Sequence, residues 1–268
     1  MTTYRDEIKG LLQAIEQATG YTVIYAVDAG SRARGLGAET SDHDLRFVYV
    51  PPTAWYFRVD RTSTREVLDK LDWAALGLSV PATIDAAGME LTKFLGLVLR
   101  SNPTALEWLA SPLLYVTTPL GQSVAHLWYM IHRRSALVQA YASQARNQAR
   151  QGWPEGATVK DWLMFLVPAL SSLESLSSGN PPSLDFDALT WNPAWPVECM
   201  REATNLATAK RLGFGGRVVE AGEVAALTAW AAQYVERSKT FDLPPEKTSD
   251  NLRVAIEQIT GRASAGWR

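Results

Sequence analysis

The hydrophobic pattern of the first fifty residues changes from a helical period to a strand period. Within residues 3–18, apolar side chains recur at helical spacing, at Ile8, Leu11, Leu12 and Ile15. The runs 21–27 and 45–50 are instead rich in β-branched and aromatic residues, which is typical of strands. The pattern therefore predicts an amphipathic helix that packs on a sheet, and two strands that flank the polar segment 30–46.

Further along the chain, strand signals become rare and helical periodicity dominates. Residues 82–85 predict a short strand that ends before Gly88, and residues 90–100 predict a helix. Beyond Thr118 the pattern indicates helices over residues 159–176, 196–211 and 220–238. We therefore expect an α/β domain over residues 1–115, followed by a mostly α-helical domain over residues 116–268.

Composition narrows the class of protein. The chain has 268 residues, of which 47% are hydrophobic and 20% charged, as in ordinary globular proteins. No apolar run is long enough to span a bilayer, so no membrane contact is expected. The single cysteine, Cys199, excludes an internal disulfide and suits the cytoplasm. The net charge of -2 argues against bulk electrostatic coating of nucleic acid, so any nucleic-acid site would be a local patch.

Two aspartates at the start of the second predicted strand are the first candidates for chemistry. Asp42 and Asp44 stand two positions apart, so on a strand both carboxylates face the same side. Such a pair repels unless a cation neutralises it, and oxygen ligands suit Mg²⁺ or Mn²⁺. His43 should point away from this face. Arg46 shares it, and could neutralise a carboxylate or meet a phosphate.

The turn at Gly30 and Ser31 is a candidate anion site. Glycine lets backbone amides approach an anion closely, and the serine adds a hydroxyl donor. Arg32 or Arg34 could add positive charge, or could be ordinary solvated loop charges.

Together, these residues resemble a known signature. A Gly-Ser pair followed about ten residues later by Asp-x-Asp is similar to the motif of DNA polymerase beta-like nucleotidyltransferases. The fuller wording, Gly30-Ser31-Arg32 with Ser41-Asp42-His43-Asp44-Leu45-Arg46-Phe47, resembles a bacterial and phage branch described as RNA-repair associated, or RlaP-like. The resemblance implies a polymerase-beta-like sheet with flanking helices. It also implies that the Gly-Ser backbone holds a nucleoside triphosphate.

The resemblance further implies that Asp42, Asp44 and a third carboxylate from a later strand hold two divalent ions, Mg²⁺ or Mn²⁺. We expect Asp85 to be the third, because it ends a predicted strand, with Glu90 as the alternative. The segment 101–109 resembles the same branch, and Glu107 within it could be a site residue or a buried hydrogen-bonding partner.

One more residue of this sequence matches the branch, and two residues differ from it. Lys160 corresponds to a lysine of the branch that implies a triphosphate ligand, although a solvated charge in the first helical turn explains it equally. Arg34 stands where the branch usually has an aromatic residue, and Val167 where it has an arginine. Both departures leave open an altered substrate or a reduced activity.

A basic stretch in the helical half is the last candidate. No acidic residue lies between Glu107 and Glu155, whereas Arg146 and Arg150 are four residues apart and share a helical face. This face could bind phosphate, from RNA or from the nucleotide, or could simply be solvated.

The leading hypothesis is a nucleotidyltransferase that moves a nucleoside monophosphate from an NTP to a hydroxyl, with an RNA end as the expected acceptor. One alternative is an enzyme that transfers AMP to a protein, as in toxin-antitoxin systems of this superfamily. Another is a non-catalytic nucleotide-binding regulator. In the leading hypothesis, two-metal catalysis by Asp42, Asp44 and Asp85 lowers the pKa of the acceptor hydroxyl and neutralises the triphosphate.

Overall fold

A five-stranded mixed sheet forms the core of the N-terminal half in the computed structural model, which describes residues 4–59, 66–150, 153–191 and 195–243. The strand order is β3-β4-β2-β1-β5. All neighbouring strands run antiparallel except β2 and β4, which are parallel. The strands are β1 (Thr22–Asp28), β2 (His43–Val50), β3 (Val67–Leu68), β4 (Ile84–Glu90) and β5 (Leu114–Thr117).

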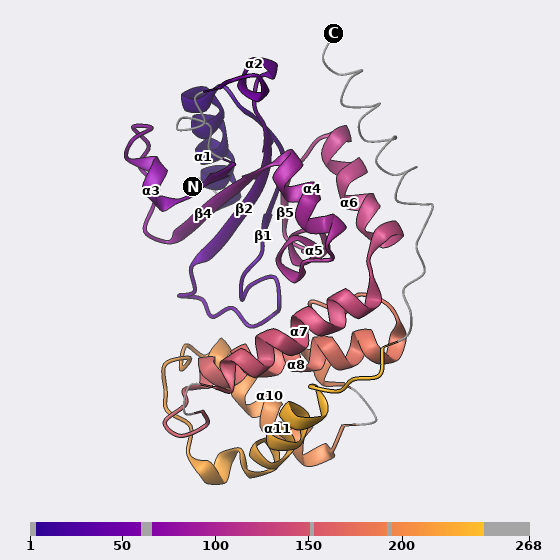
Figure 1. Ribbon diagram of the computed structural model, residues 1–268. Coiled ribbons are helices and arrows are strands. Elements are labelled where there is room, and N and C mark those ends of the chain that lie inside the picture. The colour runs from indigo at the N-terminus through magenta and orange to yellow at the C-terminus, as the bar shows by residue number, and fades with distance from the viewer. Residues whose placement is uncertain (1–3, 60–65, 151–152, 192–194, 244–268) are drawn as a thin grey trace.

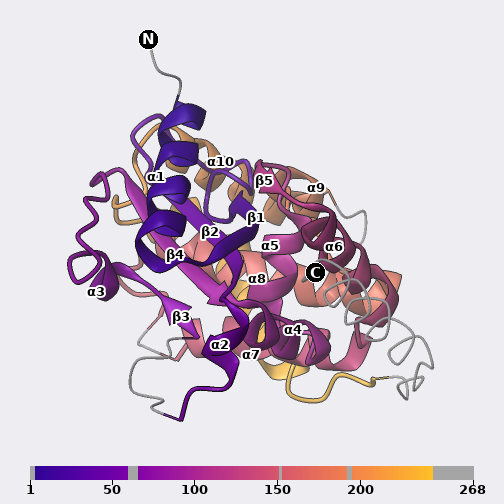
Figure 2. The same cartoon turned by 90° about the horizontal axis from the view of Figure 1, so that it is seen from above.

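Helices cover both faces of this sheet (Figures 1 and 2). On one face, α1 buries the four apolar residues that its pattern predicted, among them Ile8 and Leu12, against β1 and β2. The opposite face packs against the helices that follow β4 and β5. The helices of this half are α1 (Tyr4–Thr19), α2 (Thr53–Tyr56), α3 (Lys70–Trp73), α4 (Leu91–Leu99), α5 (Pro103–Ala110) and α6 (Pro119–Ile131).

The C-terminal half is helical and is built around α8. This helix starts with a capping box between Thr158 and Asp161, and it ends at Gly179 in the left-handed conformation. Its apolar residues are buried on several sides, because α7, α9, α10 and α11 pack around it (Figure 1). The elements are α7 (Arg134–Gln148), α8 (Val159–Ser178), α9 (Phe186–Thr190), α10 (Val197–Arg211), the short 3-10 helix η2 (Ala221–Glu223) and α11 (Ala225–Arg237).

The predicted fold class is confirmed: an α/β sheet with flanking helices precedes a mostly helical region. The predicted boundary after residue 115 falls within β5, and α6 still packs on the sheet through Val124. Two residues of α7, Leu137 and Tyr141, also belong to the apolar cluster on this face of the sheet. The two halves therefore share part of their packing.

The fourth strand extends further than its pattern predicted. It runs through Gly88 to Glu90, although a glycine commonly interrupts a strand. The reason is the neighbouring strand: a Cβ on Gly88 would lie 2.2 Å from the ring of Phe47. Gly88 thus makes room for a buried aromatic side chain and does not end the strand.

Candidate active site

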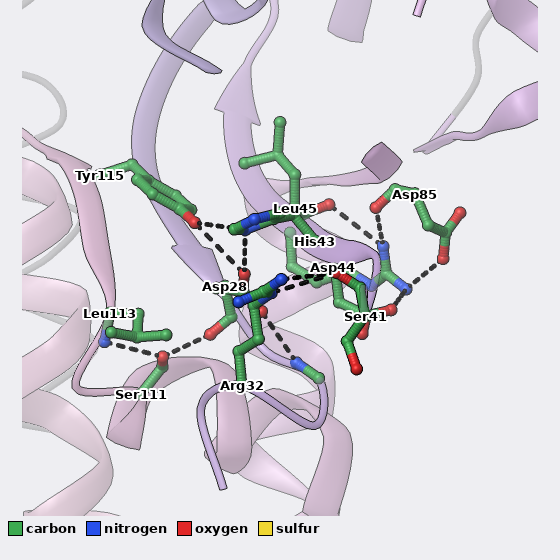
Figure 3. A network of polar contacts seen from close by, with 12 residues as sticks. Asp28, Arg32, Ser41, His43, Asp44, Leu45, Asp85, Ser111, Leu113 and Tyr115 are labelled. Carbon is green, nitrogen blue, oxygen red and sulfur yellow. Dashed lines mark hydrogen bonds and ion pairs between the residues drawn. The ribbon is translucent and has the colours of Figure 1, made fainter. Parts of the chain in front are cut away.

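Three aspartates from two neighbouring strands line one cavity of about 550 Å³. Asp42 immediately precedes β2, Asp44 lies within β2, and Asp85 lies on β4. Because β2 and β4 are parallel, and Asp44 pairs in register with Asp85, the two carboxylates occupy adjacent positions. The structure thus brings the three predicted acids together, and Figure 3 shows Asp44 and Asp85.

Arg46 links two of these carboxylates. Its Nη2 atom lies 3.1 Å from Oδ1 of Asp44 and 2.6 Å from Oδ2 of Asp85. Its Nη1 atom also donates to the main-chain carbonyl of Asp85, at 2.6 Å. Of the two roles that the sequence left open for Arg46, these contacts are those of a group that neutralises carboxylates.

The cluster disfavours the charged form of Asp44. Burial raises the pKa of this carboxyl above its ordinary value, and the nearby Asp28, Asp85 and Asp42 raise it further, while Arg46 acts in the opposite direction. A cation that approaches these oxygens would relieve the same repulsion.

Glu90, the alternative third carboxylate, lies at the far end of β4. It lies five positions after Asp85, which corresponds to about 16 Å along a strand. Its buried side chain caps α4 by accepting hydrogen bonds from the amides of Thr92 at 2.8 Å and Lys93 at 3.0 Å. It also accepts a bond from the Tyr56 hydroxyl at 2.6 Å. This acid is committed to a structural role, which leaves Asp85 as the acid next to Asp44.

The turn between β1 and β2 packs directly on the acids. A Cβ on Gly30 would lie 1.5 Å from Oδ2 of Asp44, so no other residue fits there without displacing that carboxylate. Ser31 lines the cavity that holds the three aspartates. Arg32 crosses the loop and donates to the carbonyls of Glu39, at 3.0 Å, and Ser41, at 2.7 Å. Arg32 therefore orders the segment that leads to Asp42.

A buried polar network that the sequence did not predict supports the other side of β2 (Figure 3). Asp28, the last residue of β1, is fully buried and lies 3.0 Å from Nδ1 of His43. It also accepts a hydrogen bond from the Tyr115 hydroxyl at 3.2 Å. The His43 ring stacks on Tyr4, and burial lowers its pKa. His43 thus points away from the carboxylate face, as strand alternation predicted.

A second cavity, of about 560 Å³, lies between the Gly30–Ser31 turn and helices α7 and α8. Both cavities are lined by Ser31, Lys160 and Lys210, so they adjoin at a hydroxyl and two amines. The loop between β1 and β2 approaches this helical half (Figure 1), where the Phe186 amide donates to the Arg34 carbonyl at 3.1 Å.

Several residues that line the carboxylate cavity were not predicted from the sequence. Lys210 belongs to α10, and Gly213, Gly215 and Gly216 of the following loop line the carboxylate cavity. No strand precedes this glycine loop, so it matches no phosphate-binding glycine motif. Its position depends on long-range contacts, such as the hydrogen bond from the Lys160 amide to the Gly215 carbonyl, 2.9 Å. No local motif reveals such contacts.

Two of the predicted phosphate ligands belong to the helical half, and Arg32 of the loop lines neither of the two cavities. Neither Arg146 nor Arg150 lines either of them. Arg146 donates to the main-chain carbonyl of Ser238 at 2.8 Å, at the C-terminus of α11, where a cation complements the helix dipole. A phosphate-binding role for this pair stays a prediction.

The departures from the branch both line the second cavity. Arg34 forms an ion pair with Glu107 at 2.6 Å, and the two side chains are only 14% and 18% exposed. Glu107 also accepts a hydrogen bond from the Tyr141 hydroxyl at 3.1 Å. Val167 contributes an apolar wall.

The donor chemistry of the first cavity suits Mg²⁺ or Mn²⁺, because its carboxylates offer hard oxygen ligands and repel each other. Among the described residues, however, no three acidic, histidine or cysteine side chains are gathered closely enough to hold a metal ion. The Arg46 guanidinium instead forms ion pairs with both Asp44 and Asp85. A metal site that used all three acids would require Arg46 to release Asp85.

The chain is similar to known proteins. The chain is 32% identical over 206 residues to "Uncharacterized protein YcgL" of Bacillus subtilis (strain 168), which covers 75% of each chain. No solved structure matches it. Across the described residues, no helix combines the length and apolar character needed to cross a membrane. Residues 4–259 match the RlaP family, described as the RNA repair pathway DNA polymerase beta family. The chain therefore belongs to the RlaP family.

Proposed function

We propose that the chain is a metal-dependent nucleotidyltransferase that transfers a nucleoside monophosphate from an NTP to a hydroxyl acceptor. The observation that carries this proposal is the junction of the two cavities at Ser31, Lys160 and Lys210. A triphosphate bound at this junction would have the aspartates on one side and a nucleoside-sized cavity on the other.

Different residues would bind the triphosphate and face the acceptor. The Ser31 hydroxyl and the two lysines supply hydrogen-bond donors and positive charge to the triphosphate. The acceptor hydroxyl gives up its proton to water and its oxygen forms a bond to the α-phosphorus. The bond from that phosphorus to the bridging oxygen breaks, and pyrophosphate leaves. Asp42 and Asp44 face the cavity in which this acceptor would enter.

Asp42 and Asp44 would hold Mg²⁺ or Mn²⁺, with Asp85 as the third ligand once Arg46 releases it. The chemistry that the ion supplies is neutralisation of triphosphate charge and a lower pKa for the acceptor hydroxyl. Arg46 holds the Asp44 and Asp85 carboxylates in place until then, through its two ion pairs.

An RNA end is the acceptor we propose, because the family description places these proteins in RNA repair. The test is to incubate the protein with each α-labelled NTP, Mg²⁺ or Mn²⁺, and a mixture of RNAs and proteins, and then to identify the labelled species. We expect labelled RNA and released pyrophosphate, neither of which should form with the Asp42→Asn variant. Labelled protein would identify the alternative acceptor instead, and no pyrophosphate release with any NTP would refute the proposal.

A further inference from the structure

We infer that the cavity between the Gly30–Ser31 turn and helices α7 and α8 binds the base of the nucleotide and selects adenine. This inference rests on the proposed function, since it takes the triphosphate to lie at the junction of the two cavities. With the phosphates at Ser31, Lys160 and Lys210, and the reacting end near the aspartates, the nucleoside extends into the second cavity.

One side of this cavity is an apolar surface that suits a planar ring. Leu163, Met164 and Val167 of α8 lie within one turn of helix and face the cavity together with Lys160, one turn earlier. Met164 is 51% exposed, although most apolar residues of α8 are buried. A bound base would cover this side chain, and the polarisable thioether packs well against aromatic rings.

The facing helix presents carboxamides. Gln144, Asn147 and Gln148 stand at positions i, i+3 and i+4 of α7, so they share the face that lines the cavity. None of the three side chains forms a hydrogen bond with another described residue, whereas Arg34 and Glu107, which also line the cavity, are bound to each other at 2.6 Å. The polar groups that remain for a base are therefore these carboxamides and the buried Nη1 atom of Arg34, which has no hydrogen-bond partner among the described residues.

The chemistry of these groups favours one base. A carboxamide offers a donor and an acceptor side by side, which matches the N6 amino group and the N7 acceptor of adenine. Guanine is best read by two parallel donors of an arginine, but Glu107 engages the Nη2 atom of Arg34, so Nη1 is the donor of that pair that stays free within the described part of the chain. Cytosine and uracil can also present a donor and an acceptor side by side to one carboxamide, whereas the two hydrogens of the adenine N6 amino group lie beside N7 and N1 and can serve two carboxamides at once. Several carboxamides on one helical face therefore favour ATP.

The test uses the full chain and the α,β-methylene analogues of ATP, GTP, CTP and UTP, which cannot be cleaved at the transferred bond. Dissociation constants are measured by calorimetry in Mg²⁺, without an acceptor. We expect the ATP analogue to bind at least about tenfold more tightly than the other three, as one good bidentate contact provides. Gln144→Ala and Asn147→Ala should reduce this preference to less than about threefold. Gln139→Ala, on the same helix and exposed but outside the cavity, is the matched control and should retain the full preference.

Met164→Ala should weaken the binding of all four analogues to the same extent, because an apolar contact with the face of a base does not distinguish the hydrogen-bonding groups at its edge. Equal affinity for the four analogues, a preference for another base, or full selectivity in both carboxamide variants would overturn the inference and leave the proposed function standing. Selective binding of the ATP analogue without any transfer from ATP would instead support the inference and refute the proposed enzyme. Absence of binding by every analogue would refute both.

Discussion

The Arg46 guanidinium and the Asp85 carboxylate lie 2.6 Å apart across the parallel strands β2 and β4. The same guanidinium lies 3.1 Å from Asp44, so an internal cation already satisfies two acids that a metal ion would use. Arg46 and a divalent ion should therefore compete for these oxygens.

We expect Arg46→Gln to bind Mn²⁺ about tenfold more tightly than the wild-type chain, because the competing charge next to the acids is removed. Titration of Mn²⁺ followed by electron paramagnetic resonance measures this affinity. Arg100→Gln removes the same charge from an exposed position outside the carboxylate cavity and should leave the affinity unchanged. Weaker Mn²⁺ binding in Arg46→Gln would show that this guanidinium organises the metal site and does not compete for it.

The raised pKa of Asp44 gives a prediction about stability and pH. In the folded chain burial disfavours the charged carboxylate, so ionisation of Asp44 destabilises the fold, and protonation relieves that cost. In EDTA, Asp44→Asn should unfold at a higher temperature than wild type at pH 7 to 8. This advantage should shrink as the pH falls through the raised pKa, and it should vanish below the ordinary aspartate value of about 4.

Thermal unfolding of both proteins across this pH range checks the prediction, with Asp187→Asn as a control, since that carboxylate is exposed and pairs with Arg211. A variant less stable than wild type at every pH would contradict it. Although it should be more stable, Asp44→Asn should lose the proposed transfer activity by a factor of at least about 100, because it removes a carboxylate that we propose as a metal ligand.

Asp85 and Glu90 should respond to amide substitution in opposite ways. Asp85→Asn should lose transfer activity and keep its stability, since this carboxylate is exposed and faces the cavity. Glu90→Gln should lose about 1 to 2 kcal/mol of stability, because the carboxylate that caps α4 is weakened, while activity per folded molecule stays near wild type. Denaturant unfolding and transfer assays of both variants test this contrast. Equal losses of activity in folded protein would place Glu90 in the site.

Alanine substitutions of Arg146 and of Arg150 should have different effects on stability. Arg146→Ala should destabilise the chain by about 1 kcal/mol, because it removes the hydrogen bond to the Ser238 carbonyl. Arg150→Ala should leave the stability unchanged, because the Arg150 side chain is exposed. If the shared helical face binds an RNA backbone, the double variant should also flatten the salt dependence of RNA affinity, by about one unit of slope for each lost phosphate contact. An unchanged slope and an unchanged nucleotide KM would leave this face with a structural role alone.

Much of the fold could be predicted from local patterns. The helical spacing of Ile8, Leu11, Leu12 and Ile15 identified the buried face of α1, since periodicity records which side of an element is covered. The positions of Asp42 and Asp44 followed from strand alternation and the Gly-Ser turn. These features depend on residues that are close together in the sequence.

The remaining features depend on contacts between distant segments. The pairing of Arg46 with Asp85 requires the register of β2 against β4, which no local pattern specifies. Lys210 reaches the carboxylate cavity because α10 packs beside α8. The buried Asp28 carboxylate accepts its hydrogen bond from Tyr115, which is far away in the sequence. Gly88 is a further example, because the requirement for glycine at this position comes from the ring of Phe47 on the neighbouring strand.

The contact between Gly30 and Asp44 makes these two positions interdependent. Any side chain at position 30 would collide with the carboxylate at position 44, 1.5 Å from its Cβ. As long as the acid is present, a side chain at position 30 could be accommodated only if that carboxylate moved. A descendant of this chain that lost the acid would be released from that constraint, and its glycine would be free to drift. In a relative, a bulky residue at position 30 would therefore indicate a displaced or missing carboxylate at position 44, and with it the loss of the proposed transfer chemistry.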